Sequence, residues 1–168
     1  MKKKNFCLFA GSFDPFTNGH LEILKKSSGL FSKMFLVVSE NLRKKPHLPL
    51  EFRYKLIKLL VKKHKLSNVE VLLNKDVLTS LLAKKLNCEF LLRGIRNSLE
   101  FEQEKIIAKN NSFINESLTT IFVMIPEPHC YISSSVFWEI FFYKNTATKR
   151  YVDDDIYLEI NKYFQMKG

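Results

Sequence analysis

The chain of 168 residues has few of the features that mark membrane, secreted or zinc-binding proteins. No apolar run approaches the roughly 20 residues needed to cross a bilayer. The basic start Met1–Lys4 precedes an apolar stretch too short for a secretion signal. The cysteines, Cys7, Cys88 and Cys130, are scattered without CxxC spacing, which argues against disulfides and a zinc site. We therefore expect Cys7 and Cys88, in their apolar contexts, to be buried thiols, and we expect a cytoplasmic location.

Among its candidate functional residues the sequence shows neither a pair of catalytic carboxylates nor a Ser-His-Asp arrangement, and no acidic cluster marks a protein-bound metal ion. Its hydrophobic fraction of 46% and its 15 phenylalanines are enough for a folded core. A chain of this length usually forms one domain, and it contains no evident linker, repeat or low-complexity segment. We therefore predict a single domain over residues 1–168, with a C-terminal helix at about 155–164.

Arginine is scarce although positive charge is abundant. The formal net charge is +10, but only five of the 27 basic residues are arginines, and the lysines are spread along the whole chain. Pairs such as Lys25–Lys26 and Lys62–Lys63 fall on the polar faces of predicted helices, where contact with solvent explains them. This distribution does not favour nucleic-acid binding, although part of the charge can attract anionic small molecules.

Short apolar runs alternate with helical patterns along the chain. We predict strands at residues 6–10, 35–38, 69–73, 90–92 and 119–124, and helices starting near 21 and spanning 50–65, about 76–87, 100–114, 133 onward and 155–164. Asp76 is the expected N-cap of the third helix. Such alternation is typical of parallel βαβ units with right-handed crossovers. The predicted fold class is α/β, a doubly wound, Rossmann-like, five-stranded parallel sheet with helices on both faces, which binds ligands beyond the carboxyl ends of its strands.

The segment Gly11–His20, with the sequence GSFDPFTNGH, directly follows the first predicted strand. A strand, a glycine-containing turn and a helix start form an anion site, because free backbone N–H groups and the positive end of the helix dipole face the loop. His20 lies in the first helical turn and can add a charge or a hydrogen bond to a bound phosphate. For an isolated Gly-His pair, the alternative is an ordinary turn with the histidine on the surface.

Two basic segments follow the second and fourth predicted strands. The first, Ser39–Pro46, is a proline-ended loop with two or three cations that can clamp a phosphate, or it is a solvated run of charge. The second contains Arg93 and Arg96, and arginine makes planar, bidentate contacts with phosphate that lysine cannot make. The alternative for these arginines is pairing with Glu100 or Glu104 on the next helix. Both can hold, since such pairing would orient the guanidinium.

Three hydroxyl residues, Ser133–Ser135, follow the fifth predicted strand at the start of a helix. Backbone N–H groups and hydroxyls at such a position can bind an anion, although simple N-capping is the alternative. All four polar segments follow strand ends, so we expect them to meet at one edge of the sheet.

Together the four segments resemble those of phosphopantetheine adenylyltransferases. Thr17–His20 matches the (H/T)xGH signature of nucleotidyltransferases, and GSFDPFTNGH is similar to the opening of this family. The family's KKP loop, its RG(L/I)R motif with a DFEYE-like helix start, and its ISSS or ISST motif follow in the same order. They stand here as Lys44–Pro46, Arg93–Arg96 with Glu100–Glu104, and Ile132–Ser135. The match extends from the N-terminus to about residue 143.

The resemblance implies an enzyme, a pantetheine-phosphate adenylyltransferase of coenzyme A biosynthesis. In that reaction Mg-ATP donates its adenylyl group to 4′-phosphopantetheine, which gives dephospho-coenzyme A and pyrophosphate. The acceptor phosphate is already anionic, so its in-line attack needs positioning and charge stabilisation but no general base. The implied cofactor is Mg²⁺ carried by ATP, with no protein metal site. The implied assembly is a homohexamer, with no nucleic-acid or membrane partner.

The resemblance also implies which residues act. The implied catalytic residues are His20, Ser12, Lys44 and Arg96. The implied ATP-binding residues are Gly11, Ser12, Phe13, His20, Arg93, Gly94, Arg96, Glu104, Ile132, Ser133, Ser134 and Ser135. The implied contacts for 4′-phosphopantetheine are Ser12, Lys44, Val77, Leu78 and Arg93. Asp14 is expected to fix the loop rather than to act chemically.

The chain departs from the family pattern at Gln103, His129 and Trp138, where a tyrosine, a tryptophan or tyrosine, and a lysine or arginine are usual. Two alternatives stay open. One is a related nucleotidyltransferase with another phosphate acceptor, such as glycerol phosphate or nicotinamide mononucleotide, although the RGIR and ISSS motifs argue against it. The other is a non-catalytic nucleotide- or RNA-binding module on the same fold. An aminoacyl-tRNA synthetase is excluded by the size of the chain and the lack of a KMSKS-like segment.

Overall fold

The structure is a computed structural model that describes residues 5–41, 45–144 and 146–166. Its strands are β1 (Phe6–Gly11), β2 (Lys33–Ser39), β3 (Val69–Asn74), β4 (Phe90–Ile95) and β5 (Thr119–Met124). Its α-helices are α1 (Asn18–Ser28), α2 (Leu50–Lys63), α3 (Thr79–Lys85), α4 (Ser98–Ile114), α5 (Ser134–Phe142) and α6 (Asp154–Gln165). The short 3₁₀ segments η1 (His129–Tyr131) and η2 (Thr146–Arg150) flank α5.

The strands form one parallel sheet in the order β3-β2-β1-β4-β5. β1 is central and pairs with β2 on one side and with β4 on the other. The order reverses between β1 and β4, so the carboxyl ends of these two strands flank the crevice in which doubly wound sheets bind ligands. The predicted doubly wound, five-stranded parallel sheet is confirmed.

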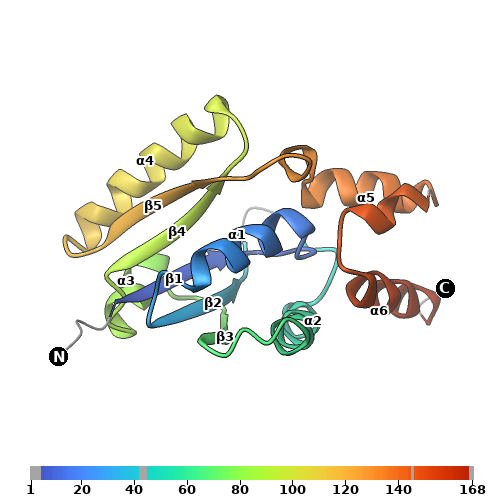
Figure 1. The fold of residues 1–168 in the computed structure, drawn as a ribbon, viewed down its shortest axis with the longest axis horizontal. Helices are drawn as coiled ribbons and strands as arrows, with labels where there is room; N and C mark the ends of the chain where they lie inside the picture. Colours follow the sequence, from blue (N-terminus) through green and yellow to red (C-terminus); the bar gives the residue numbers. More distant parts are fainter. Residues whose placement is uncertain (1–4, 42–44, 145, 167–168) are drawn as a thin grey trace.

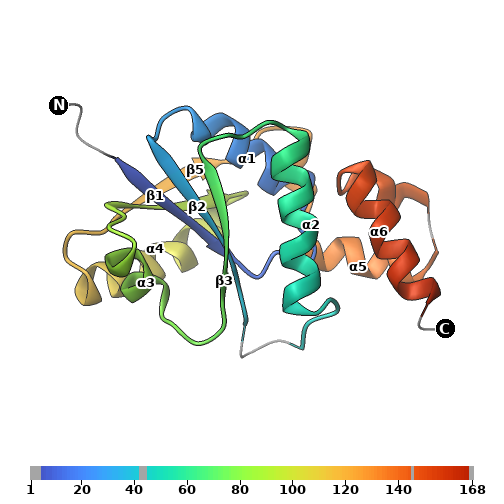
Figure 2. The same ribbon diagram turned by 90° about the horizontal axis from the view of Figure 1, so that it is seen from below.

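Helices cover both faces of this sheet. Figures 1 and 2 show α1 and α2 on one face and α3 and α4 on the other, with α5 and α6 at the opposite end of the molecule from α4. The larger hydrophobic cluster, on the α1 and α2 face, includes Phe9, Leu36 and Ile57. The smaller cluster includes Leu8 and Ala83 of α3. Leu8 and Phe9 therefore point to opposite faces, as the two-residue period of a strand requires.

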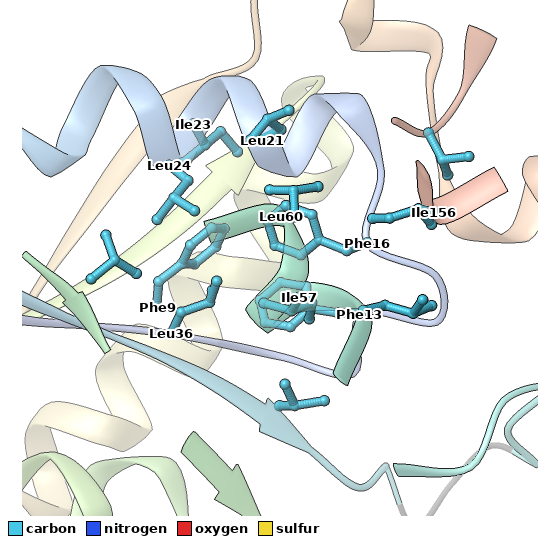
Figure 3. Close-up of a cluster of buried hydrophobic side chains, with 14 of the residues drawn as sticks. Phe9, Phe13, Phe16, Leu21, Ile23, Leu24, Leu36, Ile57, Leu60 and Ile156 are labelled. Atoms are coloured by element: carbon cyan, nitrogen blue, oxygen red, sulfur yellow. The ribbon is translucent and has the colours of Figure 1, made fainter. Parts of the chain in front are cut away.

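Two phenylalanines of the loop between β1 and α1 complete the larger cluster. Figure 3 shows Phe13 and Phe16 beside Ile57 and Leu60 of α2, with Ile156 of α6 nearby. Both rings are almost fully buried. Burial of side chains of this size contributes about 1.5–3 kcal/mol each. The loop that carries the GSFDPFTNGH motif is therefore anchored by its own aromatic residues.

The C-terminal elements are attached to the body by polar contacts as well as by apolar packing. Asp153, the N-cap of α6, accepts a hydrogen bond from Lys63 at 2.7 Å and lies 3.3 Å from Nε2 of His64, the C-cap of α2. The carbonyl of Tyr151 accepts a hydrogen bond from the backbone N–H of Asn18 at 2.8 Å. The C-terminal segment thus contacts both α2 and the first turn of α1.

The predicted start of the third helix is wrong. Asp76 does not cap it, because α3 begins only at Thr79 and has seven residues. The side chain of Asn74 explains the delay. It accepts a hydrogen bond from the N–H of Val77 at 3.2 Å and donates one to the carbonyl of Val77 at 2.8 Å, which holds the intervening residues in a turn.

The fourth strand is longer than its apolar run predicts, and the first helix begins earlier. β4 continues to Ile95, paired with β5, so Arg93 and Gly94 lie within the strand rather than after it. α1 begins at Asn18 with Thr17 as its N-cap. The chemistry-bearing residues are therefore held by regular structure more than by loops.

The burial of two thiols agrees with the expectation from the sequence. Cys7 and Cys88 are buried as predicted, and burial raises the pKa of each thiol to about 12. Both therefore stay protonated and unreactive at neutral pH. Within the described residues, the helices are too short or too polar to traverse a lipid bilayer.

Candidate active site

A pocket of about 400 Å³ opens where β1 and β4 end, at the switch point of the sheet. Every residue that the resemblance implies for ATP binding lines it, from the end of β1 and the loop after it, the first turn of α1, the end of β4, the first half of α4 and the start of α5. Small-molecule sites have volumes of roughly 300–1,000 Å³. Three of the four polar segments therefore meet at one edge of the sheet, as predicted.

The described part of the fourth segment lies next to this pocket. Lys45 and Pro46 line a smaller cavity of about 100 Å³, which shares Ser12, Ser134 and Ser135 with the larger pocket. The hydroxyl-bearing residues of the loop after β1 and of α5 thus stand between the two cavities. A ligand with phosphates at two points could contact both.

The pocket does not establish a place for three residues that the resemblance implies. Lys44 lies outside the described residues. Val77 and Leu78 lie in the turn between β3 and α3, are 39% and 60% exposed, and do not line the pocket. The roles of all three in binding the acceptor stay predictions.

Asp14 fixes the loop between β1 and α1, as predicted. Its carboxylate accepts hydrogen bonds from the backbone N–H groups of His47 at 2.7 Å and Leu48 at 3.2 Å. Its backbone carbonyl accepts one from Nε1 of Trp138 at 2.8 Å. One residue thereby joins the loop to the segment before α2 and to α5.

Phe13 holds an unusual backbone conformation at the floor of the pocket. Its φ angle is 46°, in the left-handed region that bulky residues rarely adopt. Its ring lies 5.4 Å from that of Phe9 and 5.2 Å from that of His20, measured between centroids. Packing on both sides compensates for the backbone strain. The turn thus brings the loop and the imidazole together.

His20 is held in one orientation by the start of α1. Its Nδ1 accepts a hydrogen bond from the backbone N–H of Thr17 at 3.0 Å, while the Thr17 hydroxyl accepts one from the backbone N–H of His20. Because a backbone N–H can only donate, we assign the proton of the neutral ring to Nε2. Nε2 has no hydrogen-bond partner within residues 5–41, 45–144 and 146–166. The ring therefore offers one N–H donor to a ligand in the pocket.

The imidazole of His20 is uncharged at neutral pH. Its burial, together with the positive charges of Arg96 and Arg93, lowers the pKa of His20 to about 3. In the absence of a bound anion the ring is therefore a neutral hydrogen-bond donor rather than a cation. The positive charge of the pocket comes from its arginines.

Arg93 is oriented by contacts on two sides. Its Nε and Nη2 donate to the two carboxylate oxygens of Glu104, at 2.7 and 2.5 Å, and its Nη1 donates to the carbonyl of Ala10 at 2.8 Å. A guanidinium has five N–H groups, so these bonds leave some free to contact an anion. The predicted pairing with the next helix is confirmed, and it orients the guanidinium at the end of β1.

Arg96 is paired in the same manner with the first turn of α4. It donates to a carboxylate oxygen of Glu100, whose other oxygen accepts a hydrogen bond from the backbone N–H of Arg96 at 3.0 Å. Its Nη1 lies 3.3 Å from the carbonyl of Ile132. Arg96 therefore bridges the start of α4 and the residue just before the three serines.

The start of α5 combines capping with free donors. The hydroxyl of Ser133 accepts a hydrogen bond from the N–H of Val136 at 3.1 Å, and the hydroxyl of Ser134 donates to the carbonyl of Pro15 at 2.9 Å. The backbone N–H groups of Ser134 and Ser135 and the hydroxyl of Ser135 have no partner among the described residues. A helix start with such free donors attracts anions, so N-capping and anion binding are compatible here.

The expectation of free amides at the start of α1 is only partly correct. The N–H of Asn18 donates to the carbonyl of Tyr151 at 2.8 Å, and the N–H of His20 faces the hydroxyl of Thr17. Both groups are used within the chain. The anion-binding capacity of this edge therefore depends on side chains and on α5 more than on the first amides of α1.

Residues that the sequence did not single out also build the site. Ile23 of α1 and Ile125, just after β5, contribute apolar wall to the pocket. Arg53 is 2% exposed and donates to the carbonyls of Leu48 at 3.0 Å, Ser39 at 3.3 Å and Ser12. The sequence does distinguish Arg53, because it is one of only five arginines and lies on the apolar face of a predicted helix. No comparable signal marks the two isoleucines.

Within the described residues, no three His, Cys, Asp or Glu side chains are grouped so that they could hold a metal ion. Glu100 and Glu104, the carboxylates that line the pocket, are engaged by the two arginines. The donors facing the pocket are therefore N–H and O–H groups, which suit phosphate oxygens rather than cations.

Comparison with solved structures identifies the class of fold. The nicotinic acid mononucleotide adenylyltransferase of Plasmodium falciparum, solved in complex with NaAD, superposes with a TM-score of 0.70 over 96% of each chain at 20% identity. A second structure of that enzyme, in complex with APC, gives a TM-score of 0.67. The chain therefore has the nucleotidyltransferase fold.

Comparison of sequences identifies the family. Residues 8–139 match the model of the family described as cytidylyltransferase-like. A phosphopantetheine adenylyltransferase of Mycoplasma mycoides subsp. mycoides SC is 38% identical over 137 residues, which cover 82% of this chain and 96% of that protein. The Helicobacter pylori (strain 26695) protein of the same name is 36% identical over 155 residues, covering 92% and 96%. The chain therefore belongs to the cytidylyltransferase-like family and, within it, to the phosphopantetheine adenylyltransferases.

Proposed function

We propose that the chain transfers the adenylyl group of ATP to 4′-phosphopantetheine and produces dephospho-coenzyme A and pyrophosphate, a step of coenzyme A biosynthesis. The observation that carries the proposal is the pocket at the ends of β1 and β4. It gathers a neutral imidazole donor, two oriented guanidinium groups and free donors at the start of α5. Such a set binds phosphates at several points at once, which is what adenylyl transfer between two phosphorylated substrates requires.

In the proposed reaction, a phosphate oxygen of the acceptor attacks the α-phosphorus of ATP in line with the bond to pyrophosphate. That bond breaks as the new one forms, and pyrophosphate leaves. The attacking oxygen is already anionic, so no side chain has to remove a proton. The protein's part is to hold the two phosphates in line and to stabilise the charge on the transferring group.

Each polar group of the pocket has a place in this scheme. Nε2–H of His20 donates to an oxygen of the transferring phosphoryl group, beside the hydroxyl of Ser12. Arg96 and the donors of Ser133–Ser135 hold the β- and γ-phosphates, which become the leaving group. Arg93, with Lys44, holds the acceptor phosphate. Gly11, Phe13 and Gly94 line the pocket beside the bound nucleotide, and Val77 and Leu78 contact the pantetheine arm.

Mg²⁺ carried by ATP would add positive charge to the phosphates of the leaving group. The residues present fit an ion held by phosphate oxygens and water, because the carboxylates of Glu100 and Glu104 are already engaged by arginines. This protein's own residues then bind the phosphates from the other sides.

The test is pyrophosphate release from Mg-ATP in the presence of 4′-phosphopantetheine, nicotinamide mononucleotide or glycerol 3-phosphate. We expect release only with 4′-phosphopantetheine. Release with one of the other acceptors would keep the mechanism but change the substrate. No release with any of them would favour a binding module, for which RNA binding with a steep salt dependence is the diagnostic result.

We also propose that the chain works as a homo-oligomer in the cytoplasm. The resemblance implies a hexamer, and α4 supports self-association because none of its residues is buried although several are large and apolar. A cytoplasmic location is consistent with the free thiols of Cys7, Cys88 and Cys130.

A further inference from the structure

Four side chains line the smaller cavity beside the reaction pocket or lie behind its lining, and none of them has a role in the proposed chemistry. They are Asp14, His47, Arg53 and Trp138, from the loop after β1, the segment before α2, α2 itself and α5. The smaller cavity is lined by the first three of these residues. Trp138 is 3% exposed and lies behind this lining.

Trp138 holds the Asp14–His47 unit at two points. Its indole Nε1 donates to the carbonyl of Asp14 at 2.8 Å. Its ring stacks on the imidazole of His47, with centroids 4.6 Å apart and planes 19° apart. The backbone N–H of His47 is in turn bound by the carboxylate of Asp14 at 2.7 Å. The three residues therefore form a closed set of contacts.

The same face of α5 makes a further contact with the loop. The hydroxyl of Ser134, four residues before Trp138, donates to the carbonyl of Pro15 at 2.9 Å. Residues four apart lie on one side of a helix, so α5 binds the consecutive carbonyls of Asp14 and Pro15 through this side. Rotation or sliding of α5 would break both hydrogen bonds.

The elements joined in this way are those that carry the anion-binding groups. α5 begins with Ser133–Ser135, and the loop that Asp14 fixes carries Ser12. Ser12, Ser134 and Ser135 line both cavities. A displacement of about 1 Å between reacting groups costs an enzyme on the order of 100-fold in rate, so the join between these elements bears directly on turnover.

We propose that Trp138 is a positioning residue that sets the distance between the phosphate-binding start of α5 and the loop after β1. This inference rests on the proposed function. Trp138 touches no reacting atom. It acts through Asp14 and His47, and its removal should affect the reaction more than the binding of either substrate.

The first arm of the test is steady-state kinetics of Trp138→Phe and Trp138→Leu. The phenylalanine keeps a ring against His47 but lacks the N–H donor, and the leucine removes both contacts. We expect kcat to fall about 3- to 10-fold in Trp138→Phe, as for loss of one hydrogen bond, and further in Trp138→Leu. The KM for ATP and for 4′-phosphopantetheine should stay within about two-fold of wild type, because an interaction that acts only in the transition state changes kcat and leaves substrate binding unchanged.

The matched control is Phe141→Leu. Phe141 lies on α5 in contact with Trp138, with ring centroids 5.5 Å apart, but it makes no contact with Asp14 or His47 among the ring contacts and hydrogen bonds of the described residues. It should lower the melting temperature at least as much as Trp138→Phe while leaving kcat near the wild-type value. A wild-type kcat in Trp138→Phe, or an equal loss in Phe141→Leu, would overturn the proposal.

The second arm does not depend on turnover. Trp138 is the only tryptophan of the chain, so tryptophan fluorescence reports on the surroundings of this one residue. We expect His47→Leu, which removes the stacked ring, to change the emission, and Mg-ATP to change the wild-type emission in a saturable manner. Absence of both changes would overturn the positioning role. A saturable change with Mg-ATP but no turnover with 4′-phosphopantetheine would support the positioning role and contradict the proposed function instead.

Discussion

At the wall of the pocket, the two ring nitrogens of His20 have separate tasks. Nδ1 accepts the N–H of Thr17 and so belongs to the cap of α1, while Nε2 remains for a ligand. An asparagine amide can replace the first nitrogen but does not reach the position of the second, whereas glutamine reaches further. The two tasks can therefore be separated by substitution.

We predict that His20→Asn lowers kcat by about 100- to 1,000-fold, as for removal of one donor to a developing negative charge. Its affinity for ATP, measured by calorimetry, and its melting temperature should stay close to the wild-type values, because its side chain can still accept from Thr17. His20→Gln should retain more activity than His20→Asn. A near-normal kcat in His20→Asn would contradict the assigned role.

The depressed pKa of His20 also predicts how stability depends on pH. The folded protein takes up a proton on His20 only near pH 3, whereas the unfolded chain does so near its ordinary pKa of 6.5. Below pH 6.5 the unfolded state therefore binds more protons, and the free energy of unfolding falls by about 1.4 kcal/mol per pH unit from this group. Above pH 6.5 the contribution is fully present and constant.

The measurement is urea unfolding of wild type and His20→Asn at several values between pH 5 and pH 8. The difference between the two proteins removes the contribution of all other groups. We expect the wild type to lose stability relative to His20→Asn as the pH falls below 6.5, and the difference between the two proteins to be constant above pH 6.5. The same pKa predicts no step in kcat from His20 between pH 5 and pH 8, and equal pH slopes in both proteins would show that the ring is not held neutral.

The site shows where sequence-based prediction of single residues succeeds and where it ends. Arg93 lies near the end of β4, while His20, Arg96 and the serines follow strand ends. Topology alone brings strand ends together, so the convergence of these residues is predictable. Arg53 donates a hydrogen bond to a residue 41 positions earlier in the chain, and Trp138 donates one to a residue 124 positions earlier. No local pattern encodes such contacts, and the sequence marks Trp138 only as a departure from the family pattern.

At the scale of elements, the order of strands and helices can be predicted because the period of the apolar residues changes between them. The residues at which the strands and helices begin and end are harder to predict. β4 runs past its apolar residues because β5 continues to pair with it, and α3 starts late because Asn74 takes over the hydrogen bonds of the turn. Both effects come from partners that a local pattern does not contain.

The contact between β4 and α1 depends on Gly94. A Cβ atom at this position would lie 2.2 Å from Cδ1 of Ile23, a buried side chain of α1 that also lines the pocket. We predict that Gly94→Ala destabilises the protein by about 1–3 kcal/mol, the usual cost of overpacking, measured by urea unfolding. Ile23→Val in the same chain removes the obstructing atom and should recover part of the loss.

Gly29 provides the matched control, because a Cβ atom there would meet nothing within 4 Å. Gly29→Ala should leave the free energy of unfolding within about 0.5 kcal/mol of wild type, as at most surface positions. If Gly94→Ala proved as harmless as Gly29→Ala, close packing of β4 on α1 would not be the reason for the glycine.

At the scale of the whole molecule, the two ends differ in how well they are packed. α5 and α6 at one end bury Phe137, Trp138, Ile156 and Ile160. α4 at the other end buries no residue, although it has 17 residues and contacts β4, β5 and α3 (Figure 1). A helix that leaves an apolar face uncovered on a folded chain usually marks a surface for association.

The uncovered face of α4 predicts where copies of the chain meet. Leu99, Ile106 and Phe113 are 70%, 61% and 88% exposed and lie seven residues apart, so they form one stripe along the helix. We predict that the double variant Ile106→Glu with Phe113→Glu reduces the mass of the wild-type oligomer, measured by size-exclusion chromatography with light scattering. Leu158→Glu, which alters an equally apolar residue of α6 that is 54% exposed, should leave the mass unchanged. The reason is that burying charged carboxylates in an apolar interface opposes association. A wild-type monomer, or equal masses for the wild type and the α4 variant, would therefore refute this assignment.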